Sequence, residues 1–553
     1  MMNHSPPSPA RPIRTVILAL LPAACAIFFA ISFCASLAAP ILRHDTASPL
    51  SIVTALAYLV LFAVAVFLLR RIPPHRDLLA AWLIILAIGI IRFTIAFSVP
   101  INLPLNTDQG LFRKFAVTLA DQGRNLDTLG ALSGHSDYFV WAGRVFPIHE
   151  GIRKLCGKND LYVMRAINVI TSVLVLMLVL YAASILLPPG IRRWPVFFLA
   201  ALPFQTYWVT DYTHHLYSST YLFAFACALL ALLRTRHLWS KAFFSAAMSI
   251  LLLLMSWHGG IDRLALGIAL GTMLAYFFLE NGKRQVCLNA LFGLLLPFAC
   301  LHLFSGPLLI NELIAGSKYH AAGSAWGFPA RGWCLDNGGE YSWRLEQMES
   351  LVPPKQKDAL MKAVLVREIR DTPLKDFARL PILKTGKLFL VGYANNWEES
   401  LQMAQSPALP ILRGFRQMSA PAFLLVVLLG ALVLIRQDLA FDRPWIVILL
   451  MPMLAWGAYV ICGETSPRYS IYAQPAMALM AGAAFMPQAN PLAMHHLRNL
   501  IKPISLAFLL LLLLFAAIRT GSHLIPPDTF SPIPSLAAPP QTVVSIPTAF
   551  TQQ

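Results

Sequence analysis

The sequence predicts an all-α polytopic membrane protein with about thirteen transmembrane helices. Hydrophobic residues make up 57% and charged residues only 12% of the 553 residues, and the mean hydropathy is +0.64. A soluble chain of this length could not bury so much apolar surface in one core. Several stretches without Asp, Glu, Lys or Arg also exceed the roughly 20 residues that a helix needs to cross a ~30 Å hydrocarbon layer. They are 15–42, 46–69, 166–191, 285–311 and 444–463.

Apolar runs along the chain mark the expected spans. The first run is too long for the apolar part of a cleavable signal peptide, and further spans follow at once, so we expect a first membrane anchor. The expected spans are 14–39, 51–69, 78–99, 160–187, 195–207, 216–233, 241–257, 264–279, 286–304, 420–436, 445–461, 468–486 and 503–519.

The basic residues indicate the orientation of the chain. With a cytoplasmic N-terminus every inner connection carries at least two of them, as the positive-inside rule expects; examples are Arg70 and Arg71, and Arg192 and Arg193. The formal net charge of +17 is spread over these short clusters, so we expect no nucleic-acid partner. The chain is expected to be a multi-pass integral membrane protein with membrane lipid around it.

This orientation places two long segments outside the cytoplasm, 100–159 and 305–419. In the second, the stretch from Pro354 to Lys387 has apolar residues at helical spacing with Lys and Arg between them. Such a pattern is typical of amphipathic helices on a membrane surface or on the end of a bundle. Cys156 and Cys334 fall one in each segment, where a disulfide is chemically allowed.

Polar residues gather where four expected connections reach the outer face. Loops are polar in any protein, so solvation or anchoring at the interface is the plain alternative for each residue. The inner connections are nevertheless poorer in Asp and His. The outer set is Asp108 after the third span, Tyr207, Asp211, His214 and His215 after the fifth, His258, Asp262 and Arg263 after the seventh, and Glu464, Arg468 and Tyr469 after the eleventh.

Arg92 lies within the third expected span, about two turns from its outer end. A cation at this depth is costly unless it reaches water, pairs or binds an anion. We expect either snorkelling or contact with an anionic group.

Four segments in a fixed order form a recognisable pattern. They are NLPLNTDQGLFRKFAVTLADQG, GRVFPIHEGIRKLCGKNDLYVMRAINVITSVLVLMLVLYAASILL, VLVREIRDTPLKDFARLPILKTGKLFLVGY and TSPRYSIYAQPAMALMAGAAF, and they cover most of 78–490. The first has an acidic residue and then an amphipathic helix in an outer loop, a long apolar helix follows, and in the last an Arg-Tyr pair precedes a span that contains proline. Together they resemble the GT-C superfamily of glycosyltransferases, in particular bacterial protein mannosyltransferases and lipid A aminoarabinose transferases.

The chain also departs from the family pattern. Many relatives carry a paired acidic sequence where this chain has Asp108 followed by Gln109. Beside the sixth span, relatives carry Glu where this chain has Asp211, His214 and His215. Residues 1–77 lie outside the resemblance.

The resemblance implies a hexosyl- or pentosyltransferase of cell-envelope glycan biosynthesis. Its donor would be one sugar on a polyprenyl phosphate, used at the outer face of a plasma membrane such as the bacterial inner membrane. Asp108 matches the family's acidic position and would be the general base of an inverting transfer. The leaving phosphate needs cations, and Arg263 and Arg468 are the first candidates, with Lys384 and Lys387 next. The acceptor stays open among glycan, lipid and protein.

The remaining candidates would bind substrate. They are Arg92, Asp211, His214, His258, Asp262, Glu464 and Tyr469. No cofactor is required by the pattern. A divalent metal such as Mn, Mg or Zn is the alternative at Asp211, His214, His215 and His258, because carboxylate and imidazole groups bind such ions.

The expected regions follow from these assignments. They are two extra N-terminal helices at 1–77, a GT-C-like catalytic module at 78–304, an outer loop at 305–419, C-terminal spans at 420–519 and a proline-rich tail without a packed core at 520–553. Rival functions are a transporter or flippase for a lipid-linked sugar, an enzyme like an O-antigen ligase, and a non-catalytic scaffold.

Overall fold

The computed structural model describes most of the chain. The described residues are 11–42, 49–98, 108–123, 149–202, 206, 208–210, 214–258, 261–279, 283–308, 324, 326–335, 338–339, 342–389, 408–436, 444–487 and 494–524. Within them every regular element is a helix, and ten helices are long and apolar enough to cross a membrane. The all-α, multi-span class is therefore confirmed.

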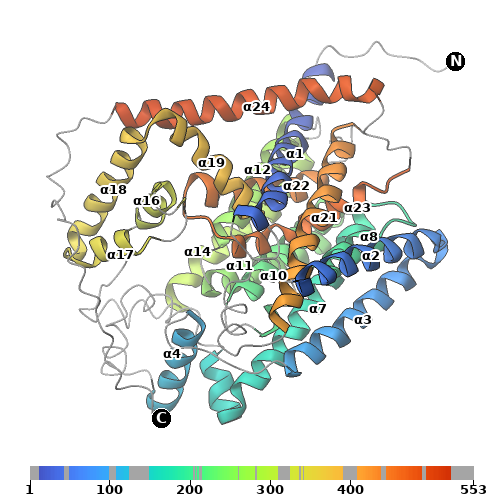
Figure 1. The fold of residues 1–553 in the computed structure, drawn as a ribbon, viewed down its shortest axis with the longest axis horizontal. Coiled ribbons are helices and arrows are strands. Elements are labelled where there is room, and N and C mark those ends of the chain that lie inside the picture. The colour runs from blue at the N-terminus through green and yellow to red at the C-terminus, as the bar shows by residue number, and fades with distance from the viewer. Residues whose placement is uncertain are drawn as a thin grey trace.

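Most expected spans coincide with long helices of the structure (Figure 1). These helices are α1 (Arg11–Leu42), α2 (Pro49–Arg71), α3 (Asp77–Ser98), α7 (Asp160–Leu186), α10 (His215–Arg234), α11 (Leu238–His258), α12 (Asp262–Leu279), α13 (Lys283–Ala290) with η4 (Leu291–Leu295) and α14 (Leu296–Leu308), α21 (Ala408–Arg436), α22 (Pro444–Trp456) with η6 (Gly457–Ile461), and α24 (Met494–His523).

Shorter helices lie in the long segments and at the ends of the spans. They are η1 (Pro74–Arg76), α4 (Asp108–Gln122), η2 (Gly157–Asn159), α8 (Arg193–Ala200), η3 (Trp208–Thr210), α16 (Gly327–Trp333), α17 (Trp343–Ser350), α18 (Pro354–Asp371), α19 (Leu374–Leu388), η7 (Pro467–Tyr472) and α23 (Gln474–Ala483). The amphipathic helices expected in both long segments are thus present as α4, α18 and α19.

At two expected spans the described helices are shorter than the sequence predicts, and the first of these spans is only partly described. At 195–207 the structure has α8 of 8 residues, which rises only about 12 Å. Its end at Ala200 lies shortly before Pro203, and proline disfavours helical backbone in the residue before it. At 468–486 a short 3-10 helix precedes α23, which has 10 residues and carries Pro475 in its first turn. Proline is tolerated there because it has no N–H to donate, so the α-helix begins at this point.

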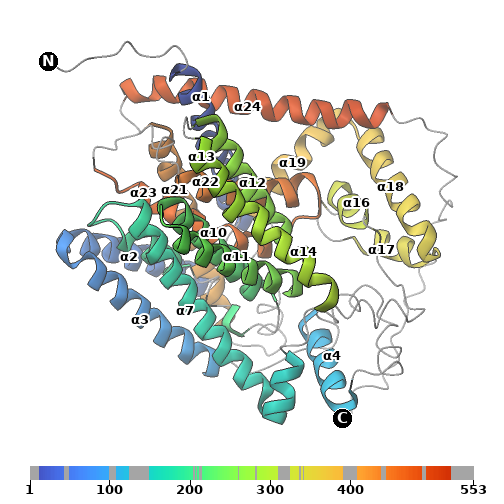
Figure 2. The ribbon, with the colours of Figure 1, turned by 180° about the vertical axis from the view of Figure 1, so that it is seen from behind.

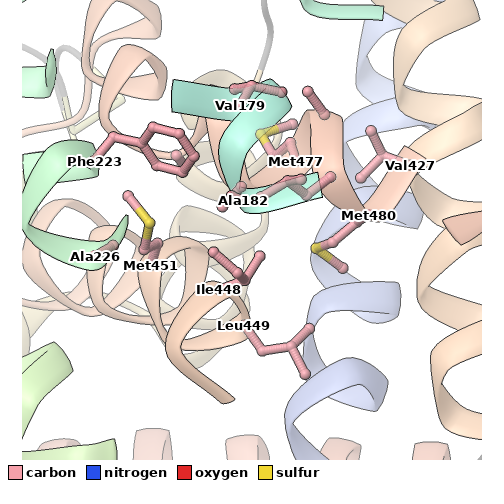
Figure 3. Close-up of a cluster of buried hydrophobic side chains, with 14 of the residues drawn as sticks. Val179, Ala182, Phe223, Ala226, Val427, Ile448, Leu449, Met451, Met477 and Met480 are labelled. Atoms are coloured by element: carbon pink, nitrogen blue, oxygen red, sulfur yellow. The ribbon is translucent and has the colours of Figure 1, made fainter. Parts of the chain in front are cut away.

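The core of the bundle forms where α7, α10, α21, α22 and α23 meet. Figure 3 shows Val179, Phe223, Val427, Ile448 and Met480 packed together there, and all five are buried. Every residue of α23 is buried, so this short helix is a plug in the core and not a lipid-facing span. Seen from behind, α11, α12 and α14 lie over the centre of the bundle (Figure 2).

Two peripheral helices present apolar side chains outward. Only 6% of the apolar window of α2 and 11% of that of α24 are buried inside the protein. Such large exposed apolar faces are normal where lipid is the solvent. In Figure 1 these helices border the bundle, with α24 along the top of the view and α2 on the right.

The helix ends that the sequence assigns to the outer face meet at one end of the bundle. Arg165 at the start of α7 donates to the carbonyl oxygen of Ala96 at the end of α3. His215 at the start of α10 contacts Tyr472, the last residue of η7. Helices α16–α19 lie at the same end, which we call the loop end.

A buried ion pair fixes the opposite end of α3. The Asp77 carboxylate accepts hydrogen bonds from the backbone N–H groups of Gly190 and Arg192 at 3.0 Å and from that of Arg193 at 3.2 Å. Arg193 Nη1 also lies 2.8 Å from Asp77 Oδ1. Both side chains are almost fully buried, so neither charge can be solvated if its partner is lost.

Replacing Asp77 by alanine is therefore expected to destabilise the protein by about 3–5 kcal/mol, because a buried guanidinium and three N–H groups lose their partner. Thermal unfolding of the purified protein in detergent measures the effect. Asp371→Ala is the matched control, because Asp371 is 55% exposed and pairs with Arg367 on the surface; the expected loss is under about 1 kcal/mol. Equal melting temperatures for the two variants would contradict the assignment.

Candidate functional site

The centre of the candidate site is the segment from Cys462 to Tyr472. Glu464 is buried, and the hydroxyl of Tyr469 donates to its Oε1 at 2.9 Å. Arg468 Nη2 donates to the same hydroxyl at 3.4 Å, and its guanidinium lies 5.3 Å from the centroid of the Tyr469 ring. The three polar residues that the sequence predicts in this connection thus form one hydrogen-bonded group.

Helix α16 brings a second guanidinium to Glu464. Arg331 Nε lies 3.5 Å from Glu464 Oε2, and Arg331 Nη1 lies 3.6 Å from Glu349 Oε2. The next residue, Gly332, touches Gly463 so closely that an added Cβ would lie 2.0 Å from the Gly463 carbonyl oxygen. A residue with a side chain at 332 would push α16 and Arg331 away from Glu464.

Helix α19 holds this contact from the other side. The fully buried Lys384 donates from Nζ to the carbonyl oxygens of Gly332 at 2.8 Å and Gly463 at 2.7 Å. Burial lowers the pKa of Lys384 to about 7. Lys387 Nζ donates to the Gly338 carbonyl oxygen at 3.3 Å. Both lysines that the sequence suggests for phosphate binding therefore bind backbone carbonyl groups of the loop end.

The start of α10 closes the site with histidine and aromatic rings. His215 Nδ1 lies 2.8 Å from the Tyr472 hydroxyl, and its ring meets the Tyr469 ring edge-on at 5.9 Å between centroids. Tyr459 stacks on Tyr469 at 4.4 Å. The ring of His214 lies 4.3 Å from that of His215, so the expected contact of the fifth connection with the eleventh is made mainly through His215.

We call Arg331, Lys384, Glu464, Arg468, Tyr469, His215 and Tyr472 the polar cluster. It combines two guanidinium groups and one amine with one carboxylate, while Lys387 and Glu349 lie at its edge. The two guanidinium groups are half-buried and the amine is buried, and cations in excess of carboxylates favour an anionic group such as a phosphate. The cluster lies at the loop end, where the spans α22 and α10 terminate.

The Arg92 side chain does not extend toward the membrane interface, as snorkelling would require. Its side chain is fully buried against α7, and Nη1 donates to the Ser172 carbonyl oxygen at 3.0 Å. Its Nε and Nη2 have no hydrogen-bond partner among the described residues. Snorkelling is therefore wrong, because α7 covers the guanidinium; contact with an anion stays a prediction.

The other predicted residues are only partly described. Asp262 and Arg263 begin α12, with Asp262 half-buried and Arg263 exposed. Asp108 is the first residue of α4, but its side chain lies outside the described part, as does that of His258. Tyr207 and Asp211 lie outside the described residues altogether.

Helix α4 itself is fixed to the loop end by ion pairs. Arg113 Nε lies 3.4 Å from Asp160 Oδ2 at the start of α7, and Arg153 lies within 3.7 Å of both Asp160 and Asp121. The backbone that carries Asp108 is thereby held beside the first turn of α7.

No group of three or more metal-ligating side chains occurs among the described residues. Because the side chains of Asp211 and His258 fall outside that part of the chain, the possible metal stays a prediction. Cys156 and Cys334 are both free in the structure; Cys334 is buried under α18.

Four residues of the site escaped prediction from the sequence, namely Arg331, Glu349, Tyr459 and Tyr472. Arg331 and Glu349 lie in the long segment 305–419, where many charged residues occur and no spacing singles these two out. The Gly and Trp residues around Arg331 were the only available signal, because glycine permits close backbone approach.

Comparisons with known proteins give distant structural matches. No protein-family model and no curated protein matches the chain. One solved structure is the archaeal oligosaccharyltransferase AglB from Archaeoglobus fulgidus in complex with an inhibitory peptide and a dolichol-phosphate: 14% identity, TM-score 0.40, covering 76% of this chain and 55% of that one. The present chain thus spans about half the length of AglB.

Another solved structure is ArnT from Cupriavidus metallidurans bound to undecaprenyl phosphate, with 12% identity and a TM-score of 0.31, covering 73% of this chain and 76% of that one. Because both TM-scores are below 0.5, we take no residue role, substrate or reaction step from either.

Lys384 offers a test of how the cluster is held together. Lys384→Met removes the donor to two buried carbonyl groups and should cost about 1–3 kcal/mol for each unsatisfied group. The pKa of Lys384 is lowered from 10.5 to about 7 in the fold, so the unfolded chain binds more protons between these values and stability should rise with pH across that window. Below about pH 7 Lys384 is protonated in both the folded and the unfolded chain, so its contribution to the free energy of unfolding no longer changes with pH.

Thermal unfolding at several pH values measures both effects. The difference in stability between the wild type and Lys384→Met should widen from pH 7 to pH 10. Lys387→Met, which removes a single longer hydrogen bond, is the control and should lose less. A difference that stays constant with pH would contradict the assigned state of Lys384.

Proposed function

We propose that the chain is an inverting glycosyltransferase that moves a sugar from a polyprenyl-phosphate donor to an acceptor hydroxyl. The observation that supports this most is the polar cluster, with its excess of cations, at the end of a bundle of membrane spans. If the lipid chain of the donor stays in the bilayer, the protein must bind the donor phosphate near the ends of the membrane spans. The resemblance of the sequence motifs to GT-C enzymes agrees with this proposal.

The guanidinium groups of Arg468 and Arg331 would bind the donor phosphate. We assign the direct contact first to Arg468, which lies beside the Tyr469 hydroxyl in the short connection after η6, and the second contact to Arg331, which pairs with Glu464 and Glu349. Glu464 would then orient both cations and the Tyr469 hydroxyl. Donors and charges that are in place before the reaction stabilise a leaving group without further reorganisation.

Asp108 would act as the general base. The acceptor oxygen attacks the anomeric carbon, the bond from that carbon to the phosphate oxygen breaks, and the electron pair leaves with the polyprenyl phosphate. The acceptor proton passes to the Asp108 carboxylate. One displacement of this kind inverts the anomeric configuration.

The test is to supply the purified protein in lipid with a radiolabelled polyprenyl-phosphate sugar and a cell-envelope extract as acceptor. We expect label to leave the lipid fraction and join the acceptor. Arg367→Ala, at an exposed position of α18, should transfer at the wild-type rate. Label that crosses the bilayer while still attached to its lipid would instead favour a flippase and overturn the proposal.

A further inference from the structure

Helix α19 lies across the ends of three candidate spans. The hydroxyl of Ser32, five residues before the end of the apolar span Ala19–Leu37 in α1, donates to the Thr385 carbonyl oxygen at 3.0 Å. Trp456 Nε1 at the end of α22 donates to the Thr385 hydroxyl at 2.8 Å. Just before α19, Arg519 Nη1 in the last turns of α24 donates to the carbonyl oxygen of Thr372, the C-cap residue of α18, at 2.8 Å, and the Arg519 guanidinium lies 5.1 Å from the centroid of the Phe377 ring in α19.

These contacts place α19 at the border of the membrane-spanning part. Each partner lies within the last turns of a helix that is apolar enough to span, so α19 cannot be at the middle of the bilayer. In Figure 1, α19 descends from α24 toward α1 and α22, across the direction of α24. This is the arrangement expected of a helix that lies along a membrane surface.

The two faces of α19 differ sharply. Phe377, Leu380 and Lys384 are buried against the bundle. The opposite face exposes Leu374 at 68%, Ile382 at 55% and Leu383 at 39%. Exposed apolar side chains grouped on one helix face are costly in water and indicate a contact surface.

Basic residues alternate with these apolar ones on the same face. Lys375 and Arg379 are exposed, and each comes directly after an apolar residue, Leu374 or Ala378. The two basic residues are four positions apart, the spacing that places side chains on the same face of a helix. Asp376, the one acidic residue of α19, is half-buried at the side of this face. We call Leu374, Lys375, Arg379, Ile382 and Leu383 the α19 face.

We propose that the α19 face docks on the anionic phospholipid headgroups of the surrounding bilayer. Leucine and isoleucine side chains enter the boundary of the acyl chains, while the lysine and arginine side chains extend to the phosphates. The positive charge of the face matches the negative surface of a membrane that contains acidic lipids. The contacts with α1, α22 and α24 place α19 near the ends of three spans, within reach of this boundary.

Docking has a consequence for the polar cluster, because the same helix carries Lys384 on its buried face. A lipid surface that holds α19 also holds the amine that joins Gly332 to Gly463. The docking itself does not rest on the proposed glycosyltransferase activity, and its test needs no sugar transfer.

The experiment uses the full chain in phosphatidylcholine vesicles with and without phosphatidylglycerol. An environment-sensitive fluorescent amino acid replaces Ile382 in one protein and Gln356, an exposed residue of α18, in another. Brominated phospholipids then quench fluorophores near the acyl boundary. We expect quenching at position 382 to be at least about twofold stronger than at 356 and to increase with phosphatidylglycerol.

The double substitution K375E/R379E should remove the increase with phosphatidylglycerol. K375Q/R379Q should remove most of it and serves as the second variant if the charge reversal impairs folding, which thermal unfolding in detergent reports. Equal quenching at 382 and 356 would overturn the proposal. Quenching at 382 that does not respond to phosphatidylglycerol would overturn the role of anionic headgroups.

Discussion

Replacing Arg468 by alanine is expected to lower the rate of sugar transfer about 10²- to 10³-fold, the loss typical of removing one preorganised group that stabilises developing charge. The proposed leaving group is a phosphate, and Arg468 is the guanidinium of the polar cluster that donates to the Tyr469 hydroxyl, in the same short connection as Glu464. Its removal leaves the phosphate with Arg331 alone, whose charge Glu464 and Glu349 already offset.

The measurement is the initial rate of label transfer from the radiolabelled donor, at a donor concentration that saturates the wild type. Arg468→Lys keeps a charge but loses the planar fork of donors, so it should recover only part of the rate. Arg367→Ala is the control for removing an arginine from the loop end. Transfer by Arg468→Ala at the wild-type rate, in a protein that melts normally, would remove Arg468 from the proposed mechanism.

The long helices could be predicted because each span must satisfy its own backbone inside lipid, which makes apolar length a direct signal. The start of α3, expected at 78, is Asp77, and the end of α22 with η6, expected at 461, is Ile461. The two spans that proved short, at α8 and α23, have equally apolar sequences. They differ because they are buried by protein and interrupted by proline, and hydropathy does not distinguish a core segment from a lipid-facing one.

The site was predicted most completely where its residues are neighbours in sequence. Glu464, Arg468 and Tyr469 could be grouped because one short connection carries all three. The contact of Glu464 with Arg331 joins two distant segments across Gly332 and Gly463, and no periodicity encodes it. The sequence also could not reveal that Lys384 donates to backbone carbonyl groups, since a buried structural amine and a phosphate-binding amine look alike in a sequence.

Asp108→Asn is expected to lower transfer about 10²- to 10⁴-fold, the usual contribution of a general base. Asparagine keeps the size of the side chain and removes its ability to accept the acceptor proton. The fold should persist, because asparagine and aspartate are equally suited to the start of a helix and Asp108 is the first residue of α4. Binding of the donor phosphate by Arg468 should also persist.

Asp121→Asn is the matched control on the same helix. Asp121 is 56% exposed and lies 3.7 Å from Arg153, so its replacement should alter stability by under about 1 kcal/mol and leave transfer intact. Three measurements separate the possibilities: thermal unfolding, binding of labelled donor, and the rate of transfer. A variant that folds, binds donor and still transfers at the wild-type rate would show that another group takes the proton. A variant that loses donor binding along with transfer would make Asp108 a residue that positions the donor, because a base acts only after the donor is bound.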